Sequence, residues 1–295
     1  MNLSFVGVGK MGLPITRLLL GAGHDVCVFD TDAAQLSAAQ AAGARAAVSL
    51  AECVGAAPLV FTSLPDDAVL RQVALGPQGL ISLVNDQAIY VDTSTVSVAL
   101  SAEIAYAAQV RSIAYLRMPV SGNAHSARTG QLTAIASGPS AAWERIKPVV
   151  SAFSVAQLYV GEAEQARVMK LAINLLVAGN AMLLAEALAL GRAGGIQWDT
   201  LLDGVAASTL SSPWLRAKAA ALKVRDFNPT FTPAQLSKDL GLMLDAGDQH
   251  QVPLPLTSLA RQTMKAVGAA GWAEEDFIAV VKLLEQQSGL PTDAV

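Results

Sequence analysis

The sequence has few charged and aromatic side chains and only two cysteines. Of 295 residues, 15% are charged, 5% are aromatic and 53% are hydrophobic. Cys27 and Cys53 have neither a metal-ligand spacing nor a redox-motif spacing, which predicts two reduced thiols and no metal centre. The net charge of -4 provides no basic surface for nucleic acid, so we expect no nucleic-acid partner.

A long apolar run and a secretory signal are also missing. The least polar stretch, Leu171 to Ala185, contains two asparagines and is shorter than the roughly 20 residues that span a bilayer. The N-terminus has no basic region before its first apolar residues and no small-residue cleavage site. These absences predict a soluble cytoplasmic protein without a membrane partner.

Two kinds of pattern divide the chain. Up to Gly161, short β-rich runs alternate with helix-length segments, which predicts an α/β fold with a parallel sheet and helices on both faces. From Glu164 to about Arg192 there is no proline and almost continuous Ala, Leu, Val and Met, which predicts one long helix. Only further helices follow, broken at "SSPW", "FNPTFTP" and "QVPLPLT". We therefore predict domains at 1–162 and 163–295, joined by the long helix.

The first predicted strand ends in a glycine-rich turn. Residues 7 to 12 read "GVGKMG", with Gly7, Gly9 and Gly12 as the glycines and Lys10 and Met11 between them. Glycines at these positions allow a tight turn and close backbone approach to a pyrophosphate at the N-terminus of the following helix. The position directly after the first strand predicts a Rossmann-type, doubly wound dinucleotide-binding domain. The plainer alternative is a turn that only shapes the backbone.

An acidic residue follows at the end of the second predicted strand. Asp30 lies 18 residues after Gly12, where a carboxylate can accept hydrogen bonds from a ribose hydroxyl pair and repel a 2′-phosphate. Thr31 stands where a phosphate-binding arginine would be expected, so NAD is favoured over NADP. Lys10 is the one cation in the glycine turn, and its charge weakens the preference for NAD over NADP. The alternative role for Asp30 is to cap a helix.

Two polar residues interrupt the long apolar helix. Lys170 and Asn174 are one turn apart and share a face. A lysine partly removed from water has its charged form disfavoured, which suits it to proton transfer, and the asparagine can contact a substrate oxygen. The alternative is a lysine that reaches along the apolar surface to water.

Polar segments also follow later predicted strands. "DTST" at 92–95 and "MPVSGNAHSARTGQL" at 118–132 lie where ligands bind in open α/β sheets, and the second is rich in donors for a carboxylate. Ordinary loops have the same composition. In "LSKDLGLMLDAG", Lys238 and Asp239 are adjacent on a predicted helix, a pattern typical of a solvated surface.

Taken in order, these blocks resemble the β-hydroxyacid dehydrogenases, the group of 3-hydroxyisobutyrate dehydrogenase and tartronate semialdehyde reductase, within the 6-phosphogluconate dehydrogenase-like proteins. The resemblance covers nearly the whole chain. It is carried by "FVGVGKMGLP" with "GHDVCVFD", "SLPDD", "VDTST", "MPVSG" with "GQLTAIASG", "VMKLAIN", and "SKDLGLMLDAG" with "PLPLT".

The resemblance implies specific roles for these residues. Lys170 would be the catalytic acid/base, with Asn174 beside it on the substrate. A homodimer or homotetramer formed through the helical half is also implied. The remaining roles implied are substrate carboxylate binding by Ser121, Gly122 and Asn123, and cofactor contacts from Leu64, Pro65, Thr95 and Lys238.

Four positions depart from the pattern of the family. Arg117, Met118 and Asn123 stand where an acid, an alanine and a glycine are common, and all three are expected beside the carboxylate pocket. Val98 stands where a proline is common after "DTST". The resemblance therefore leaves the substrate open but implies the reaction type.

We predict a hydride transfer between NAD and a short 3-hydroxy acid, interconverting the alcohol with a semialdehyde or ketone. One alternative is an NADPH-dependent aldehyde or imine reductase of the same fold. The other is a noncatalytic dinucleotide-binding protein, which fold alone does not exclude.

Overall fold

The computed structural model describes residues 1–292 and divides into two compact units, Met1–Leu171 and Ala172–Val295. The division falls inside the long helix α9 (Gln165–Ala193), whereas residue 162 was the predicted boundary. The side chain of Arg167 explains this difference, because it ties the first turn of α9 into the first unit.

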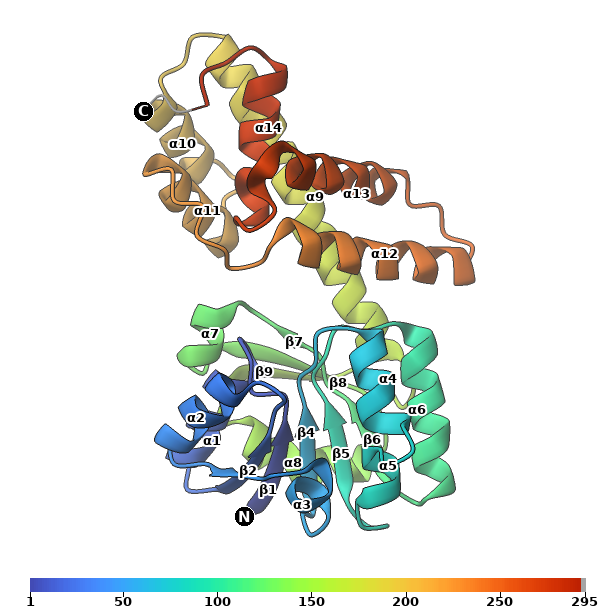
Figure 1. Ribbon diagram of the computed structural model, residues 1–295. Coiled ribbons are helices and arrows are strands. Elements are labelled where there is room, and N and C mark those ends of the chain that lie inside the picture. The colour runs from blue at the N-terminus through green and yellow to red at the C-terminus, as the bar shows by residue number, and fades with distance from the viewer. Residues whose placement is uncertain (293–295) are drawn as a thin grey trace. The chain divides into compact units, whose positions relative to one another are not determined.

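The first unit contains the predicted doubly wound parallel sheet (Figure 1). Its strand order is β3-β2-β1-β4-β5-β6, which places the reversal of strand order between β1 and β4. The two-residue strand β3 was not predicted, because two residues carry no readable alternation. The strands are β1 (Asn2–Val6), β2 (Asp25–Phe29), β3 (Arg45–Ala46), β4 (Leu59–Thr62), β5 (Ile89–Asp92) and β6 (Ala114–Arg117).

Alternating side chains of the strands fill two apolar cores, one on each face of the sheet. Leu3 and Phe5 of β1 face the helices α1, α2 and α8, and Val6 faces α3, α4, α5 and α6. This is the predicted arrangement of helices on both faces (Figure 1). The helices are α1 (Gly12–Gly21), α2 (Ala33–Ala41), α3 (Leu50–Val54), α4 (Asp67–Leu75), α5 (Leu80–Leu83), α6 (Val98–Val110) and α8 (Ser140–Val150).

A second, three-stranded sheet completes this unit. It consists of β7 (Val120–Ser121), β8 (Leu132–Ala136) and β9 (Ser154–Tyr159), with α7 (Ala124–Arg128) between the first two. β7 pairs antiparallel with β8, and β8 pairs parallel with β9. The strands that the sequence predicts at "LTAIASG" and "AQLYVG" are β8 and β9, which therefore lie outside the large sheet. The short connection through α7 returns the chain as a hairpin instead of a crossover.

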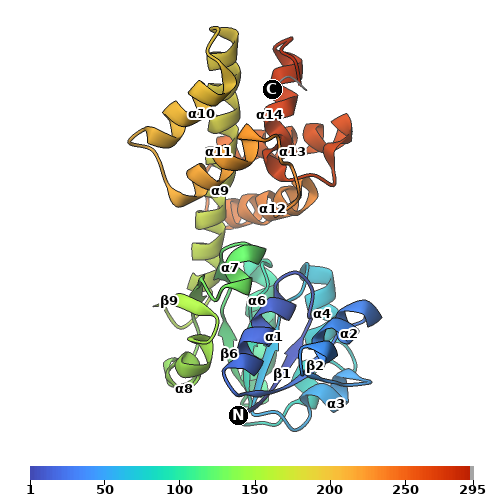
Figure 2. The same cartoon turned by 90° about the vertical axis from the view of Figure 1, so that its left-hand side faces the viewer.

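The described part of the second unit is helical throughout, as predicted. Three helices begin at prolines, Pro213, Pro233 and Pro255, because proline fits the first turn, where its missing N–H has no partner to lose. In both views α12 lies beside α13 (Figures 1 and 2). After α9, the helices are α10 (Trp198–Ala207), α11 (Pro213–Lys223), α12 (Pro233–Gln249), α13 (Pro255–Val267), the π-helix η1 (Gly268–Trp272), the 3-10 helix η2 (Phe277–Ala279) and α14 (Val280–Gln287).

Helix α9 is long and apolar enough to cross a membrane by length and composition, with a mean hydropathy of 1.8 in its most apolar window. The length of the apolar run therefore does not decide between a membrane span and a core helix. The core helix of a soluble protein passes the same test. The first turn of α9 carries the buried, ion-paired Arg167, and Ala181 and Leu188 further along are fully buried. Of the most apolar window of α9, 33% is buried, so part of the helix packs inside the described structure.

Candidate active site

The glycine-rich turn leaves an open cradle at the carboxyl end of β1. Gly7 has φ +88°, and a Cβ there would lie 2.4 Å from the carbonyl oxygen of Ser63. A Cβ on Gly12 would lie 1.9 Å from the carbonyl oxygen of Gly7. A Cβ on Gly9, by contrast, would meet no atom within 4 Å. Packing therefore requires Gly7 and Gly12, while Gly9 borders space that suits a pyrophosphate.

Asp30 braces this turn from the end of β2. Its Oδ2 accepts a hydrogen bond from the backbone N–H of Val8 at 2.8 Å, and its Oδ1 accepts one from the N–H of Asp32 at 2.9 Å. Asp32 caps α2 by accepting from the N–H of Ala34 at 2.8 Å. Two carboxylates thus stand at the end of β2, which disfavours an added phosphate there. Sequence reasoning missed Asp32. Lys10 is exposed and Met11 half-buried in the same turn.

The loop after β4 lies against the glycine turn and bonds to the loop after β5. A Cβ on Gly7 would lie 2.9 Å from a methyl carbon of Leu64, so Leu64 borders the cradle. The backbone N–H of Leu64 donates to Ser94 Oγ at 2.9 Å, and Thr95 follows directly. Pro65 is exposed and Thr95 half-buried. The structure therefore brings these predicted cofactor residues together at the reversal of strand order, where such sheets bind ligands.

Arg167, which sequence reasoning missed, is the centre of a buried polar network behind these loops. Its guanidinium donates to the carbonyl oxygen of Ser94 at 2.6 Å, to Ser101 Oγ at 3.1 Å and to the hydroxyl of Tyr115 at 3.0 Å. It also forms an ion pair with Asp92, whose side chain is fully buried. Four partners satisfy the guanidinium, as a buried charge requires.

Lys170 lies three residues after Arg167 and is buried, with 8% of its surface exposed. This low exposure favours a lysine partly removed from water over one that reaches along the apolar surface to bulk water. Asn174, one turn further, belongs to the second unit and donates from Nδ2 to Asp239 Oδ2 at 2.8 Å. Asp239 is 3% exposed, and its Oδ1 lies 3.0 Å from Lys238 Nζ. The adjacent Lys–Asp pair is thus not an ordinary solvated surface pair.

The predicted carboxylate loop has a fixed backbone. Gly122 has φ +136°, and a Cβ there would lie 2.7 Å from a methyl carbon of Leu132. Oδ1 of Asn123 accepts from the N–H groups of His125 and Ser126, each at 3.0 Å, and so caps α7. The acceptor of Asn123 is therefore engaged, which leaves its amide N–H groups for a ligand. Ser121 is half-buried and Gly122 exposed beside it.

Two of these departures from the family pattern have side chains that bond or pack inside the first unit. The Nε of Arg117 donates to Glu164 Oε1 at 2.8 Å, and its guanidinium lies over the ring of Tyr115, 4.9 Å from the ring centroid. Met118 is fully buried in the core on the α1 face of the sheet. Internal contacts thus occupy both side chains, and their place beside the carboxylate pocket stays a prediction.

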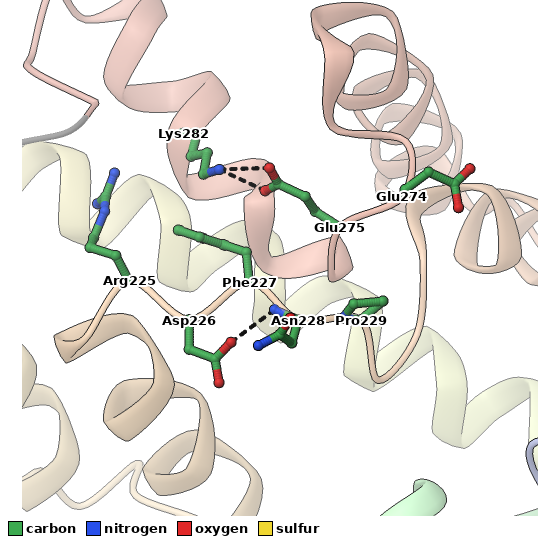
Figure 3. Close-up of a pocket in the computed structure, with 8 residues that line it drawn as sticks. All are labelled: Arg225, Asp226, Phe227, Asn228, Pro229, Glu274, Glu275 and Lys282. Carbon is green, nitrogen blue, oxygen red and sulfur yellow. Dashed lines mark hydrogen bonds and ion pairs between the residues drawn. The ribbon is translucent and has the colours of Figure 1, made fainter.

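A pocket in the second unit has a different character (Figure 3). Lys282 pairs with Glu275 and lies over the ring of Phe227, while Asp226 accepts from the N–H of Asn228 (Figure 3). The lining carries two cations and three acids, so the pocket offers no excess positive charge to an anionic substrate. None of the predicted site residues lines it. Its lining is Arg225, Asp226, Phe227, Asn228, Pro229, Glu274, Glu275 and Lys282.

Comparison with known proteins agrees with this geometry. The family model described as the NAD binding domain of 6-phosphogluconate dehydrogenase matches residues 2–161. The model described as NAD-binding of NADP-dependent 3-hydroxyisobutyrate dehydrogenase matches residues 165–284. The two matches meet close to the start of α9.

Individual relatives match along their full length. The chain is 34% identical to 2-(hydroxymethyl)glutarate dehydrogenase of Eubacterium barkeri, covering 98% of this chain and 96% of the relative. It is 31% identical to an NAD-dependent L-serine dehydrogenase of Pseudomonas aeruginosa, covering 98% and 99%. The crystal structure of a 3-hydroxyisobutyrate dehydrogenase from Salmonella typhimurium matches with TM-score 0.86 at 30% identity, covering 96% and 99%.

The predicted fold, family and reaction class are therefore confirmed. The chain belongs to the β-hydroxyacid dehydrogenases, the NAD(P)-dependent oxidoreductases of short hydroxy acids.

Proposed function

We propose that this enzyme transfers a hydride between NAD and a short 3-hydroxy acid, with Lys170 as general acid/base. The observation that carries the proposal is the burial of Lys170 three residues after Arg167, which bonds to the loop after β5. The bound nicotinamide supplies the redox chemistry. Lys170 takes the alcohol proton during oxidation and returns it to the carbonyl oxygen during reduction.

The loop of Ser121, Gly122 and Asn123 would hold the substrate carboxylate. A serine hydroxyl and the amide N–H groups of Asn123 are hydrogen-bond donors, as a carboxylate requires. Because Oδ1 of Asn123 caps α7, these donors are held in a fixed direction. The chemistry of this loop thus fits a small carboxylic acid, and Asn123 adds a donor that a glycine would not provide.

Asn174 would orient the reacting oxygen of the substrate. Its Nδ2 donates a hydrogen bond to the buried carboxylate of Asp239, which fixes the orientation of the amide. The carbonyl oxygen and the second N–H then point elsewhere and remain for the substrate. Lys238, 32% exposed, would contact the cofactor.

NAD is the proposed cofactor, with NADP less favoured. The supporting observation is the pair of carboxylates, Asp30 and Asp32, at the end of β2. Rates with NADH and NADPH measured side by side test this choice and also the alternative of an NADPH-dependent aldehyde or imine reductase. A preference for NADPH would overturn it.

The proposed role of Lys170 is tested by Lys170→Ala. We expect turnover to fall by about 10²-fold or more, with NADH affinity largely retained, since general acid/base catalysis contributes on this scale. Lys147→Ala is the matched control, because Lys147 is an exposed lysine of the same unit that pairs only with Glu144. Normal turnover in Lys170→Ala would remove the assignment.

The substrate is tested by a panel of hydroxy acids with NAD. Hydroxymethylglutarate and L-serine lead the panel, because the names of two relatives specify them. 3-Hydroxyisobutyrate, glycerate, threonate and sulfolactate extend it. A protein that binds NADH yet oxidises none of these would be the noncatalytic alternative.

A second copy of the chain is the proposed protein partner, in a soluble cytoplasmic homodimer or homotetramer. Leu176, Leu183 and Leu190 recur every seven residues on α9 and are 63%, 66% and 76% exposed. An apolar stripe with this period suits packing against another helix. Leu183→Glu should lower the mass measured by light scattering to that of one chain, whereas Leu210→Glu, at an 84% exposed leucine outside α9, should not. An unchanged mass in Leu183→Glu would contradict this interface.

A further inference from the structure

Arg167 is bonded to more elements of the first unit than any local role in α9 requires. Its side chain, 1% exposed, extends from the first turn of α9 to β5, β6, α6 and the loop after β5. In an apolar helix, a cation in the first turn needs no buried partners, because it can remain in water. Helix formation alone therefore does not explain why this guanidinium is buried.

The network continues from Arg167 to the cofactor loops through one carboxylate. Asp92 Oδ1 accepts from Thr62 Oγ1 and from Ser94 Oγ, each at 2.6 Å. Ser94 Oγ in turn accepts from the backbone N–H of Leu64 at 2.9 Å. An unbroken chain of hydrogen bonds thus links the guanidinium to the loop that borders the glycine cradle.

The same residue sets the start of the helix that carries Lys170. Residues three apart lie on neighbouring positions of one helix face, so the direction of Lys170 follows that of Arg167. We infer that Arg167 is a positioning residue, which fixes Lys170 relative to the loops at Leu64 and Thr95. This inference rests on the proposed role of Lys170. The planar guanidinium of an arginine donates hydrogen bonds to several elements at once in a fixed geometry, which a lysine ammonium does not.

Arg167→Lys tests the inference while keeping the charge beside Asp92. A displacement of about 1 Å at the reacting groups can lower the rate by about 10²-fold, so we expect kcat to fall on that scale with little change in KM for NAD. Tyr115→Phe and Ser101→Ala each remove one hydrogen bond of Arg167 and should lower kcat less. These two variants keep the test decisive if Arg167→Lys does not fold.

Arg192→Lys is the matched control. Arg192 lies near the other end of α9, its side chain is only 11% exposed, and it pairs with the buried Glu285. We expect Arg192→Lys to lower the melting temperature and to leave kcat unchanged in folded protein. An equal loss of kcat in both variants would show a general effect of burial and would overturn the inference.

A double-variant cycle separates positioning from mere stability. In a Lys170→Ala background there is no lysine to position, so adding Arg167→Lys should cause no further loss of kcat. A further loss equal to that in wild type would refute the inference. A wild type that oxidises no hydroxy acid refutes the proposed function instead, whereas an active wild type with an equally active Arg167→Lys variant refutes only the positioning role.

Discussion

Raising the pH above 10 should destabilise the first unit steeply, because two of its tyrosines are sealed in the core. Tyr90 and Tyr115 face each other on β5 and β6, with ring centroids 5.0 Å apart and exposures of 0% and 3%. Burial raises the pKa of Tyr90 and of Tyr115 above the usual value, and the charge of Asp92 raises both further. The folded state therefore retains two protons that the unfolded chain releases near pH 10.

The sign and size of the effect follow from this difference. A group whose pKa is higher in the folded state contributes stability that is complete below the unfolded pKa and is lost as pH rises toward the folded pKa. Each tyrosine contributes about 1.4 kcal/mol per pH unit, so the pair should lower the free energy of unfolding by about 2.7 kcal/mol per unit above pH 10. In Tyr90→Phe the contribution of the pair to the slope should fall by half.

Tyrosinate absorbance measured together with circular dichroism checks this reasoning. Tyr90 and Tyr115 should ionise only together with unfolding. The reasoning would be refuted if both ionised near pH 10 while the dichroism stayed native, or if Tyr90→Phe left the slope of wild type unchanged.

Three further outcomes follow from single sites. Gly9→Ala should weaken NADH binding measured by calorimetry without lowering the melting temperature, because its Cβ would meet no protein atom, whereas Gly12→Ala should lower the melting temperature. Glu164→Leu should lower the free energy of unfolding in urea by about 3–5 kcal/mol, because it leaves a buried guanidinium without its counter-charge. A hydrogen bond with Cys53 lowers the pKa of Cys27 to about 7, yet both thiols are buried. They should react with a thiol reagent only as fast as the unit opens, and an immediate reaction in native protein would contradict this.

Local patterns were sufficient to predict most of the fold. The glycine turn, the alternation of strands and helices and the prolines at 213, 233 and 255 are signals within a few residues of one another, and the structure follows them. Strands β3 and β7 were missed because each is two residues long and is defined by its neighbours. The separate small sheet was missed because strand pairing depends on how a connection returns the chain.

The candidate site was predictable where its residues are adjacent in sequence and not where they are paired over long distances. Arg167 and Asp92 are 75 residues apart, and Asn174 and Asp239 are 65 apart. An arginine at the first turn of an apolar helix has the same local pattern as a solvated helix end. A Lys–Asp dipeptide likewise reads as surface until its neighbours in space are known.

Stability alone does not account for a fully buried Arg167–Asp92 pair. Desolvating two charges costs several kcal/mol each, and well-packed apolar residues in place of such a pair are often neutral or stabilising. What an apolar replacement does not provide is direction, because dispersion contacts tolerate small shifts that a set of directed hydrogen bonds resists. Asn174 is held in the same way, by a carboxylate that is 3% exposed. The polar residues on either side of Lys170 along α9 are thus each fixed by a buried acid, as the proposed positioning of that lysine requires.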